Sequence, residues 1–299
     1  MTEQKFLLFE DRGLLAVTGG DSEDFLQGLI SNDIGKVGPE RAIHTAFLTP
    51  QGRYLHDFFI VRLGDALLLD CEAARRDDLQ RRLTMYKLHA DIDLADKSDE
   101  FTAAAFFGEG AAESLGLSGE AGHAVPFSGG IVYVDPRLAA AGGRAVLPRQ
   151  DAGVVLGKAG FEVALRVDYD FLRLTLGLPD GSRDLEVEQA ILLENGFDEL
   201  SGLDWNKGCY LGQELTSRTK YRGLVRKRLM PVMIDGPTPS PGTPVMAGGG
   251  KVGKMRSAID GIGLALIRLE EMEKAAAAGT SFTAGEARLT PKKPDWAVF

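Results

Sequence analysis

A cysteine with cationic neighbours stands out in the segment KGCYLGQELTSRTKYRG, residues 207–223. Lys207 precedes Cys209 by two residues, and further cations follow, among them Arg218 and Arg222. Nearby positive charge and the amino end of a helix both favour a thiolate over a thiol, and the thiolate is the nucleophile and the metal ligand. The residue types therefore predict a functional thiolate at Cys209. They leave open the alternative of a small structural cysteine packed beneath a turn.

The residues after the cysteine have the pattern of a helix, which we predict over residues 210–219. Such a helix places Glu214 and Arg218 one turn apart, in the acid-before-base order that stabilises a helical ion pair. A carboxylate held in a pocket also suits a planar ligand edge with adjacent N–H donors, such as that of a pterin. Arg218 and Arg222 would then face an acidic tail on that ligand. A solvated run of ion-pairing side chains is the alternative interpretation.

Three more side chains of this segment have types that suit a ligand site. Trp205 can stack on a planar ligand, because an indole offers a large flat face. Tyr210 and Gln213 can line the same site. Each has a structural alternative, since a Trp is at home in a core and the other two can pack beneath the loop.

A second set of reactive residues, His56 and Asp57, stands at the start of a predicted strand. Successive side chains of a strand point to opposite faces, so only one of the two can face a given interior. If Asp57 faces inward, the interior gains an acid/base group. If His56 does, the chemistry differs, and the sequence does not decide between them.

The elements that must position these residues alternate between short apolar strands and amphipathic helices. We expect a helix that begins near residue 21, with Asp21 or Ser22 as its cap. A strand pair is expected at residues 57–61 and 66–69. Further predicted elements are a helix over residues 73–86, strands over 101–107, 131–134 and 143–147, and a mostly helical region over 161–200.

The residue composition of the sequence changes in its last quarter. The segment GPTPSPGTPV, residues 236–245, holds four prolines in ten residues, which excludes a regular helix or a central strand. Short apolar stretches and glycines follow, as in a small β-barrel, with one helix expected over residues 268–278. We therefore predict two domains, residues 1–225 and 226–299, the first with two sub-domains that divide near residues 95–100.

Composition limits the classes of function. The chain has 299 residues, 44% hydrophobic and 26% charged, as in an ordinary globular protein. Its net charge of −9 argues against wrapping duplex nucleic acid, so no direct nucleic-acid partner is expected. We expect no membrane partner, because no apolar run approaches the roughly 18 residues that a bilayer requires.

The number and spacing of the cysteines indicate the cellular compartment of the protein. Cys71 and Cys209 are the only cysteines, and they form neither a disulfide framework nor a self-contained zinc or iron–sulfur site. The first residues show neither a secretory signal nor an Arg-rich transit peptide. These features predict a reducing cytoplasm.

The run KGCYLGQE, residues 207–214, resembles the signature K-G-C-[FY]-x-G-Q-E of the YgfZ-type folate-binding proteins. These proteins are relatives of the glycine-cleavage T-protein, the tetrahydrofolate-dependent aminomethyltransferase. The residues ELTSRTKYRG that follow are similar to those of the iron–sulfur cluster assembly branch, mitochondrial and bacterial. The resemblance covers most of the chain and includes DFLQGLISNDI (residues 24–34), AFLTPQGRYLHDFFIV (46–61) and GGKVGKMRS (249–257).

The resemblance implies an α+β fold: a T-protein-like folate-binding module of α/β layers around a central opening, followed by a small six-stranded β-barrel. It implies that tetrahydrofolate or a derivative binds in that opening. It also implies a role in maturing or repairing four-iron enzymes, including radical enzymes that modify tRNA. The predicted folate-binding residues are Trp205, Lys207, Tyr210, Gln213, Glu214, Arg218 and Arg222.

The sequence also departs from the T-protein pattern. The T-protein has two aspartates where this chain has His56-Asp57, so one acid is missing; this argues against aminomethyl transfer, whereas folate binding is still expected. The transferase motif lacks the signature cysteine, which implies that Cys209 is one ligand of an iron–sulfur cluster shared with a partner, an A-type scaffold protein.

Three hypotheses of function follow. The leading one is a folate-binding accessory protein for iron–sulfur cluster assembly that acts through Cys209. The alternative is a folate-dependent one-carbon transferase or demethylase with Asp57 as its acid/base group, so whether the chain is an enzyme stays open. A third is RNA association through the cations of residues 207–228, against which the net charge weighs.

Overall fold

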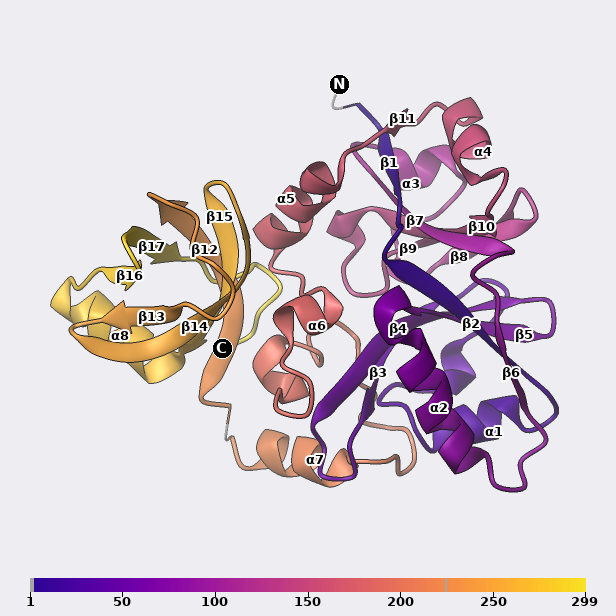
Figure 1. The fold of residues 1–299 in the computed structure, drawn as a ribbon, viewed down its shortest axis with the longest axis horizontal. Coiled ribbons are helices and arrows are strands. Elements are labelled where there is room, and N and C mark those ends of the chain that lie inside the picture. The colour runs from indigo at the N-terminus through magenta and orange to yellow at the C-terminus, as the bar shows by residue number, and fades with distance from the viewer. Residues whose placement is uncertain (1–2, 224) are drawn as a thin grey trace. The chain divides into compact units, whose positions relative to one another are not determined.

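The computed structural model describes residues 3–223 and 225–299, and Figure 1 shows their course. The chain divides into two compact units that do not follow chain order. Unit 1 consists of Met1–Leu48, Leu55–Arg166 and Leu200–Leu211. Unit 2 consists of Thr49–Tyr54, Val167–Glu199 and Gly212–Phe299. The predicted domain boundary near residue 226 stays a prediction.

Unit 1 contains two antiparallel-rich sheets. The five-stranded sheet has the order β3-β4-β5-β2-β6, and the six-stranded sheet has the order β11-β1-β7-β10-β9-β8. The strands of the first are β2 (Arg12–Thr18), β3 (Ile43–Leu48), β4 (Tyr54–Leu63), β5 (Ala66–Glu72) and β6 (Asp93–Asp96). Those of the second are β1 (Lys5–Leu8), β7 (Phe101–Phe107), β8 (Ala124–Phe127), β9 (Gly130–Val134), β10 (Gly143–Pro148) and β11 (Glu162–Val163).

The predicted strands of this unit are confirmed. β4 and β5 form an antiparallel hairpin in which Leu63 pairs with Ala66, so that Gly64 and Asp65 make the two-residue loop. Gly64 has a φ of 60°, the left-handed conformation that such a loop favours. The aromatic and β-branched residues of β4 are buried on both faces, which explains the continuous apolar run.

The helices of unit 1 are α1 (Ser22–Gln27), α2 (Arg76–Lys87), α3 (Ala111–Ser114) and α4 (Ala152–Lys158). The short 3₁₀ turns η1 (Ile34–Lys36), η2 (Ala73–Arg75) and η3 (Ala139–Ala141) accompany them. Of the two predicted caps, Asp21 occupies the N-cap position of α1, but its side chain makes no capping hydrogen bond. Asp21 has φ −98° and ψ 8°, outside the extended conformation of a capping residue, and its carboxylate accepts from the main-chain N–H of Asp91 at 2.8 Å instead.

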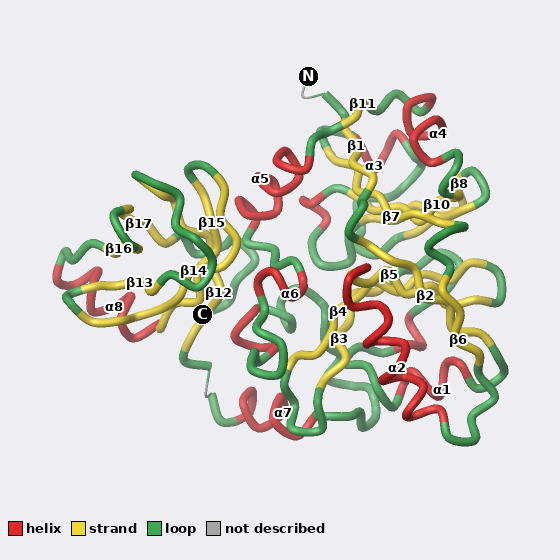
Figure 2. The backbone as a smooth tube through the Cα atoms, viewed as in Figure 1, coloured by secondary structure: helices red, strands yellow, loops and turns green. Residues whose placement is uncertain are grey.

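Unit 2 contains a closed six-stranded barrel of order β12-β15-β14-β13-β16-β17, which confirms that prediction. Its strands are β12 (Lys227–Asp235), β13 (Pro244–Ala247), β14 (Gly250–Ile259), β15 (Ile262–Arg268), β16 (Phe282–Ala284) and β17 (Ala287–Pro291). Met230, Met255 and Ile267 are among its fully buried core residues. Residues 236–243 of the proline-rich segment form the loop before β13, drawn green in Figure 2, whereas its last two residues, Pro244 and Val245, begin that strand. The helix α8 (Leu269–Ala278) matches the predicted late helix.

Residues 161–200 are less helical than predicted. They hold α5 (Arg166–Leu176), α6 (Gly181–Asp184) and the 3₁₀ turn η4 (Leu192–Asn195), joined by turns. α5 ends because Gly177 adopts a left-handed φ of 76°. Another helix of unit 2, α7 (Gln213–Tyr221), carries part of the cationic segment.

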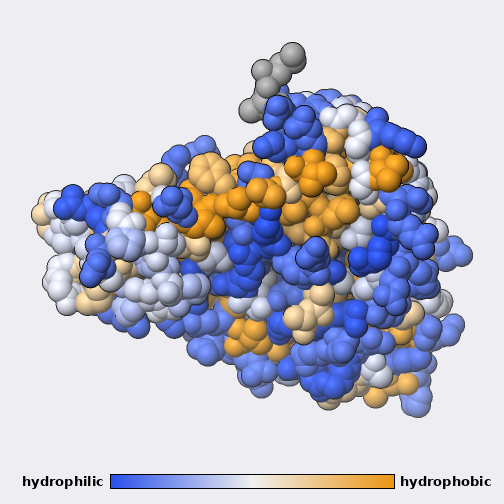
Figure 3. Space-filling model, turned by 45° about the horizontal axis from the view of Figure 1, so that its top comes forward, coloured by the Kyte–Doolittle hydropathy of each residue, from blue (hydrophilic) through white to orange (hydrophobic). Residues whose placement is uncertain are grey.

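Much of the face in Figure 3 is hydrophilic, with apolar side chains gathered in places. Exposed large apolar residues of the described chain include Val167 and Phe171 of α5, while Leu174 of the same helix is buried. Within residues 3–223 and 225–299, no helix is both long and apolar enough to span a bilayer.

Candidate functional site

The segment that carries Cys209 is held in place by the buried ammonium of Lys207. Its Nζ donates to three main-chain oxygens, those of Gln27 at 2.8 Å, Ile30 at 2.6 Å and Asn32 at 2.8 Å. An ammonium has three donors, so all of them are used within the protein. Burial lowers the pKa of Lys207 to about 8, which leaves it mainly charged at pH 7. Lys207 therefore joins the segment to the loop that follows α1, and its role toward folate stays a prediction.

The turn before the cysteine is built on Asp204. Its Oδ1 accepts from the main-chain N–H groups of Asn206 at 2.6 Å and Lys207 at 2.9 Å, and its Oδ2 pairs with Lys36 at 2.5 Å. Burial opposes ionisation, but these bonds and the Lys36 cation hold the pKa of Asp204 below its usual value. A carboxylate that accepts from the next main-chain groups is a common turn former, and here it fixes the chain just before Cys209.

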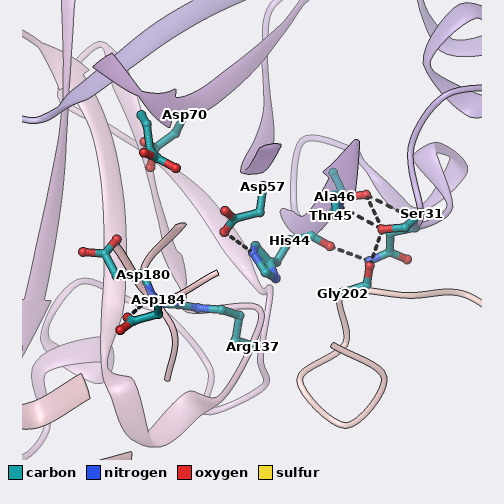
Figure 4. Close-up of polar contacts among 12 residues, drawn as sticks. Ser31, His44, Thr45, Ala46, Asp57, Asp70, Arg137, Asp180, Asp184 and Gly202 are labelled. Carbon is teal, nitrogen blue, oxygen red and sulfur yellow. Dashed lines mark hydrogen bonds and ion pairs between the residues drawn. The ribbon is translucent and has the colours of Figure 1, made fainter. Parts of the chain in front are cut away.

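The loop after α1 is also joined to residues 201–202, just before this segment, by a buried polar network (Figure 4). Ser31 donates from its hydroxyl to the oxygen of Gly202 at 2.7 Å. The amide of Asn32 donates to the oxygens of His44 and Ser201, both at 2.8 Å. Sequence reasoning missed these residues as site residues, although the polar Ser-Asn-Asp run directly after the apolar Leu29-Ile30 was a visible signal.

Cys209 is exposed, whereas Cys71 is buried and its pKa is raised to about 12 by burial. The alternative of a cysteine packed beneath a turn is therefore wrong for Cys209. Its neighbour Gly208 is also exposed, and a side chain added there would meet no atom within 4 Å. The thiol is thus open to a partner. Among the described residues, no group of three or more His, Cys, Asp or Glu side chains could hold a metal ion.

The helix predicted after the cysteine exists but begins at Gln213, three residues later than expected. Gly212 precedes it with a left-handed φ of 80°, which ends the preceding loop at that point. The predicted ion pair is wrong: Glu214 and Arg218 are both described and exposed, and no ion pair joins them. An exposed pair of long side chains gains little in water, so the helix does not require it.

The turn of residues 49–53 lies against the start of α7. A Cβ on Gly52 would stand 2.6 Å from both the oxygen of Gly212 and the Cβ of Leu215, and Gly52 has a φ of 79°. Only glycine fits there without a shift. Arg53 of the same turn donates to the main-chain oxygen of Gln189 at 2.9 Å.

The other predicted folate residues lie in both units. Trp205 is half-buried in unit 1, where Tyr210 is buried with its ring centre 5.1 Å from the Lys207 Nζ. Gln213, Glu214, Arg218 and Arg222 belong to unit 2, the first half-buried and the others exposed. Tyr210 thus packs beneath the loop, as its structural alternative described. Folate binding by this set stays a prediction.

The hydrogen-bond partners of His56 and Asp57 show which face of β4 each side chain points to. His56 bonds through Nε2 to Asp78 of α2 at 3.0 Å, and burial together with the Arg75 cation lowers its pKa to about 4. Asp57 points to the opposite face of β4, as strand alternation requires. His56 therefore faces the helix, and Asp57 faces the interior of unit 1.

Asp57 forms a buried acid–base pair with His44 of the neighbouring strand β3 (Figure 4). Its Oδ2 lies 3.0 Å from the His44 Nε2, and the side chains are 7% and 1% exposed. Burial lowers the pKa of His44, although the Asp57 carboxylate opposes that effect. A neutral imidazole beside a carboxylate can hold or move a proton. Sequence reasoning missed His44, because only strand pairing places it beside Asp57.

The same face of the sheet carries further paired charges. Asp70 of β5 accepts from Arg12 at 2.6 Å and from Arg144 of the other sheet at 2.7 Å. The Arg144 guanidinium lies 4.0 Å from the ring centre of Phe59, which shares its strand face with Asp57. Despite burial, the two cations keep the pKa of Asp70 below its usual value. The interior between the sheets therefore holds a buried carboxylate that is paired with two buried guanidinium groups.

Comparison with known proteins identifies relatives of the whole chain. Iron-sulfur cluster assembly factor IBA57, mitochondrial, of Mus musculus is 32% identical over 312 residues, which cover 96% of this chain and 84% of the relative. The protein of the same name from Homo sapiens is 33% identical over 306 residues, covering 96% and 83%. The IBA57 homolog of Pyricularia oryzae is 30% identical and covers 97% of this chain and 79% of that protein.

The chain belongs to the IBA57 family. Its last part agrees with this, since residues 226–299 match the pattern of the CAF17 C-terminal β-barrel domain. A solved structure, the glycine cleavage system aminomethyltransferase T of Bartonella henselae, superposes with a TM-score of 0.77 at 16% identity, covering 99% of this chain and 86% of that one. This IBA57-family chain therefore has the T-protein fold, as predicted, with mixed α/β content and the C-terminal barrel.

The comparison corrects the predicted location of the IBA57-family chain. The relatives are named as mitochondrial proteins, which contradicts the cytoplasmic assignment. The prediction failed because two cysteines without a disulfide framework fit any reducing compartment, of which the cytoplasm is only one.

Proposed function

We propose that this IBA57-family chain takes part in iron–sulfur cluster assembly, with Cys209 as one thiolate ligand of a cluster shared with an A-type scaffold partner. Two observations support the proposal. The relatives across the whole chain are named as iron–sulfur cluster assembly factors. The observation that carries it is the exposed Cys209, which stands on a loop fixed by the three hydrogen bonds of Lys207.

The cluster is the cargo of this reaction. Clusters of this kind are held by several thiolates, so one cysteine from this chain requires the remaining ligands from the partner. On coordination the thiol of Cys209 loses its proton to solvent, because the thiolate is the ligand. The rigid loop lowers the entropy lost when the thiolate meets the cluster, since the main chain around it is already ordered.

The test mixes the anaerobic protein with a cluster-loaded A-type scaffold and records visible absorption and native mass. We expect a cluster-bearing complex with the wild type and none with Cys209→Ser. Cys71→Ser is the matched control: it removes the other thiol, which is buried and donates to the oxygen of Gly13, a bond that serine can replace. Complex formation by Cys209→Ser equal to that of the wild type would refute the ligand role.

The proposed cargo leads to a wider role in cells. Delivery of clusters to four-iron enzymes, including radical enzymes that modify tRNA, would make any link to tRNA indirect. We expect cells that lack the chain to lose the tRNA modifications made by such enzymes. Recovery with the wild type but not with Cys209→Ser would support this route. Full recovery with both would exclude Cys209 from it.

Tetrahydrofolate binding is the second part of the proposal. The YgfZ-type signature in residues 207–214 supports it, as do the exposed Glu214, Arg218 and Arg222, a carboxylate and two cations suited to a pterin edge and a glutamate tail. We expect 5-formyltetrahydrofolate to bind in calorimetry and Glu214→Gln to weaken it by about tenfold or more. Glu273→Gln, which removes an exposed carboxylate from α8, should bind as the wild type does. Equal binding by both variants would remove Glu214 from the site.

One observation favours the alternative of a folate-dependent one-carbon transferase or demethylase. The buried Asp57–His44 pair is an acid–base arrangement inside a T-protein fold. This alternative requires turnover by the isolated protein when it is given tetrahydrofolate and a small N-methyl amine, and loss of turnover in Asp57→Asn. If the wild type forms no methylene-tetrahydrofolate, the alternative fails and the assembly role is retained.

A further inference from the structure

A basic pocket lies on the barrel of unit 2, outside every site described above. Its volume is about 310 Å³, and its wall contains five cations and one carboxylate: Lys227, Lys251, Lys254, Arg256, Arg268 and Glu186. The whole chain has a net charge of −9. This local concentration of positive charge is therefore opposite in sign to the protein that carries it.

The pairing of the strands brings like charges together. Lys227 of β12 stands directly opposite Arg268 of β15 in the antiparallel register. Like charges at such a position destabilise a strand pair. Lys254 and Arg256 of β14, where the pairing with β15 is irregular, both donate to the same carboxylate oxygen, Oε1 of Glu186. The fold thus holds several cations close together against their repulsion.

The protein supplies too little negative charge to compensate them. Glu186 pairs with Lys254 at 2.7 Å and with Arg256 at 2.8 Å, and these two partners lower its pKa to about 2. Its single charge is therefore shared by two cations. Among the residues that the structure describes, Lys227, Lys251 and Arg268 form no ion pair.

Two other carboxylates act on the pocket only from a distance. Burial raises the pKa of Glu194, and the Lys227 cation opposes that rise. The hydrogen bond from Lys274 lowers the pKa of Glu270, and the Arg268 cation adds a smaller effect. Neither carboxylate is bonded to the cation that it faces. The pocket therefore keeps an excess of cationic donors directed to a common space.

Arg256 gives a second, independent indication of a ligand. It is only 8% exposed, and its Nε is buried without a hydrogen-bond partner among the described residues. A buried donor without an acceptor is unfavourable, and native proteins rarely leave one. A bound oxyanion can accept from this Nε while Glu186 accepts from the Nη1 at 2.8 Å.

We propose that this basic pocket binds a small molecule that carries a diphosphate or triphosphate group. The volume is at the lower end of the range for small-ligand sites. Arg and Lys together suit phosphate oxygens, because the guanidinium offers paired donors and the ammonium a point charge. A concave pocket of this size accommodates a compact polyanion better than a nucleic-acid backbone, which the overall charge of −9 repels. An acidic peptide is the competing occupant, and the test separates the two.

The test is calorimetric titration of the full chain at low salt with inorganic triphosphate, ATP and hexaglutamate. The pocket variant is Lys251→Gln with Arg268→Gln, two exposed residues whose loss leaves the core intact. The matched control is Arg288→Gln with Lys292→Gln, which removes two exposed cations of the same types from or beside β17, outside the pocket wall. Net charge is thereby equal in both variants.

We expect triphosphate and ATP to bind the wild type and the control with affinities within about twofold, and the pocket variant at least about tenfold more weakly. Glu186→Gln should bind more tightly than the wild type, because it frees Lys254 and Arg256 for the ligand. Equal weakening in both double variants would show a diffuse charge effect and overturn the proposal. Tighter binding of hexaglutamate than of triphosphate would assign the pocket to an acidic peptide and would equally overturn it.

Discussion

The two cysteines differ in their environment, and this difference decides which one can react. Cys209 is exposed, and Cys71 is buried with a pKa raised to about 12. We predict that iodoacetamide at pH 8 adds one carbamidomethyl group to the native protein, at Cys209, and two in urea. Mass spectrometry of peptides locates the adducts. Modification of Cys71 in the native protein would contradict the burial that the structure shows.

Lys207 is the residue on which the cysteine loop depends. Lys207→Met removes three charge-assisted hydrogen bonds and leaves three main-chain oxygens without that donor, so we expect a loss of about 3–5 kcal/mol in the free energy of unfolding. Lys36 has a side chain that is 41% exposed and pairs with Asp204, so Lys36→Met should lose less than about 1 kcal/mol. Urea unfolding measures both. Equal losses would show that the anchor is not the ammonium.

At the scale of elements, the contact between the turn of residues 49–53 and α7 rests on one glycine. Gly52→Ala places a Cβ 2.6 Å from the oxygen of Gly212 at a φ of 79°, so we expect a loss of about 3 kcal/mol in unfolding free energy. The control is Gly64→Ala, at a φ of 60° with no atom within 4 Å of the added Cβ, where only about 1 kcal/mol is expected. Urea denaturation compares the two, and a smaller loss at Gly52 than at Gly64 would rule out the close contact.

The same scale shows what the sequence can and cannot predict. The strands at 101–107 and 143–147 were predictable because local apolar pattern decides them. Residues 161–200 were not, since their turns are stabilised by buried ion pairs such as that of Arg173 with Asp184 at 2.8 Å. The candidate site was likewise predictable from the sequence only in part. The signature located Cys209, but the bonds of Lys207 to residues 27–32 join segments about 180 positions apart, which no local pattern reports.

For the whole molecule, the buried ionisable groups determine how stability depends on pH. Asp70, Asp135 and Asp170 have pKa values that their Arg partners hold below the usual range, against the effect of burial. A carboxylate with a depressed pKa stabilises the folded state above its unfolded pKa of about 4, and that contribution is lost as the pH falls. These pairs lie in both compact units, so a fall in pH lowers the stability of both units.

His56 extends that loss to a higher pH. The pKa of His56 is lowered from 6.5 in the unfolded chain to about 4 in the folded one. As the pH falls, the unfolded state therefore binds a proton first, and the free energy of unfolding decreases by about 3 kcal/mol between pH 6.5 and 4. In His56→Gln the amide can still donate to Asp78, and this part of the pH dependence should disappear. The exposed His89→Gln serves as control and should keep the wild-type slope. Urea midpoints measured from pH 7 to pH 4 give the slopes, and an unchanged slope in His56→Gln would show that His56 is not the titrating group.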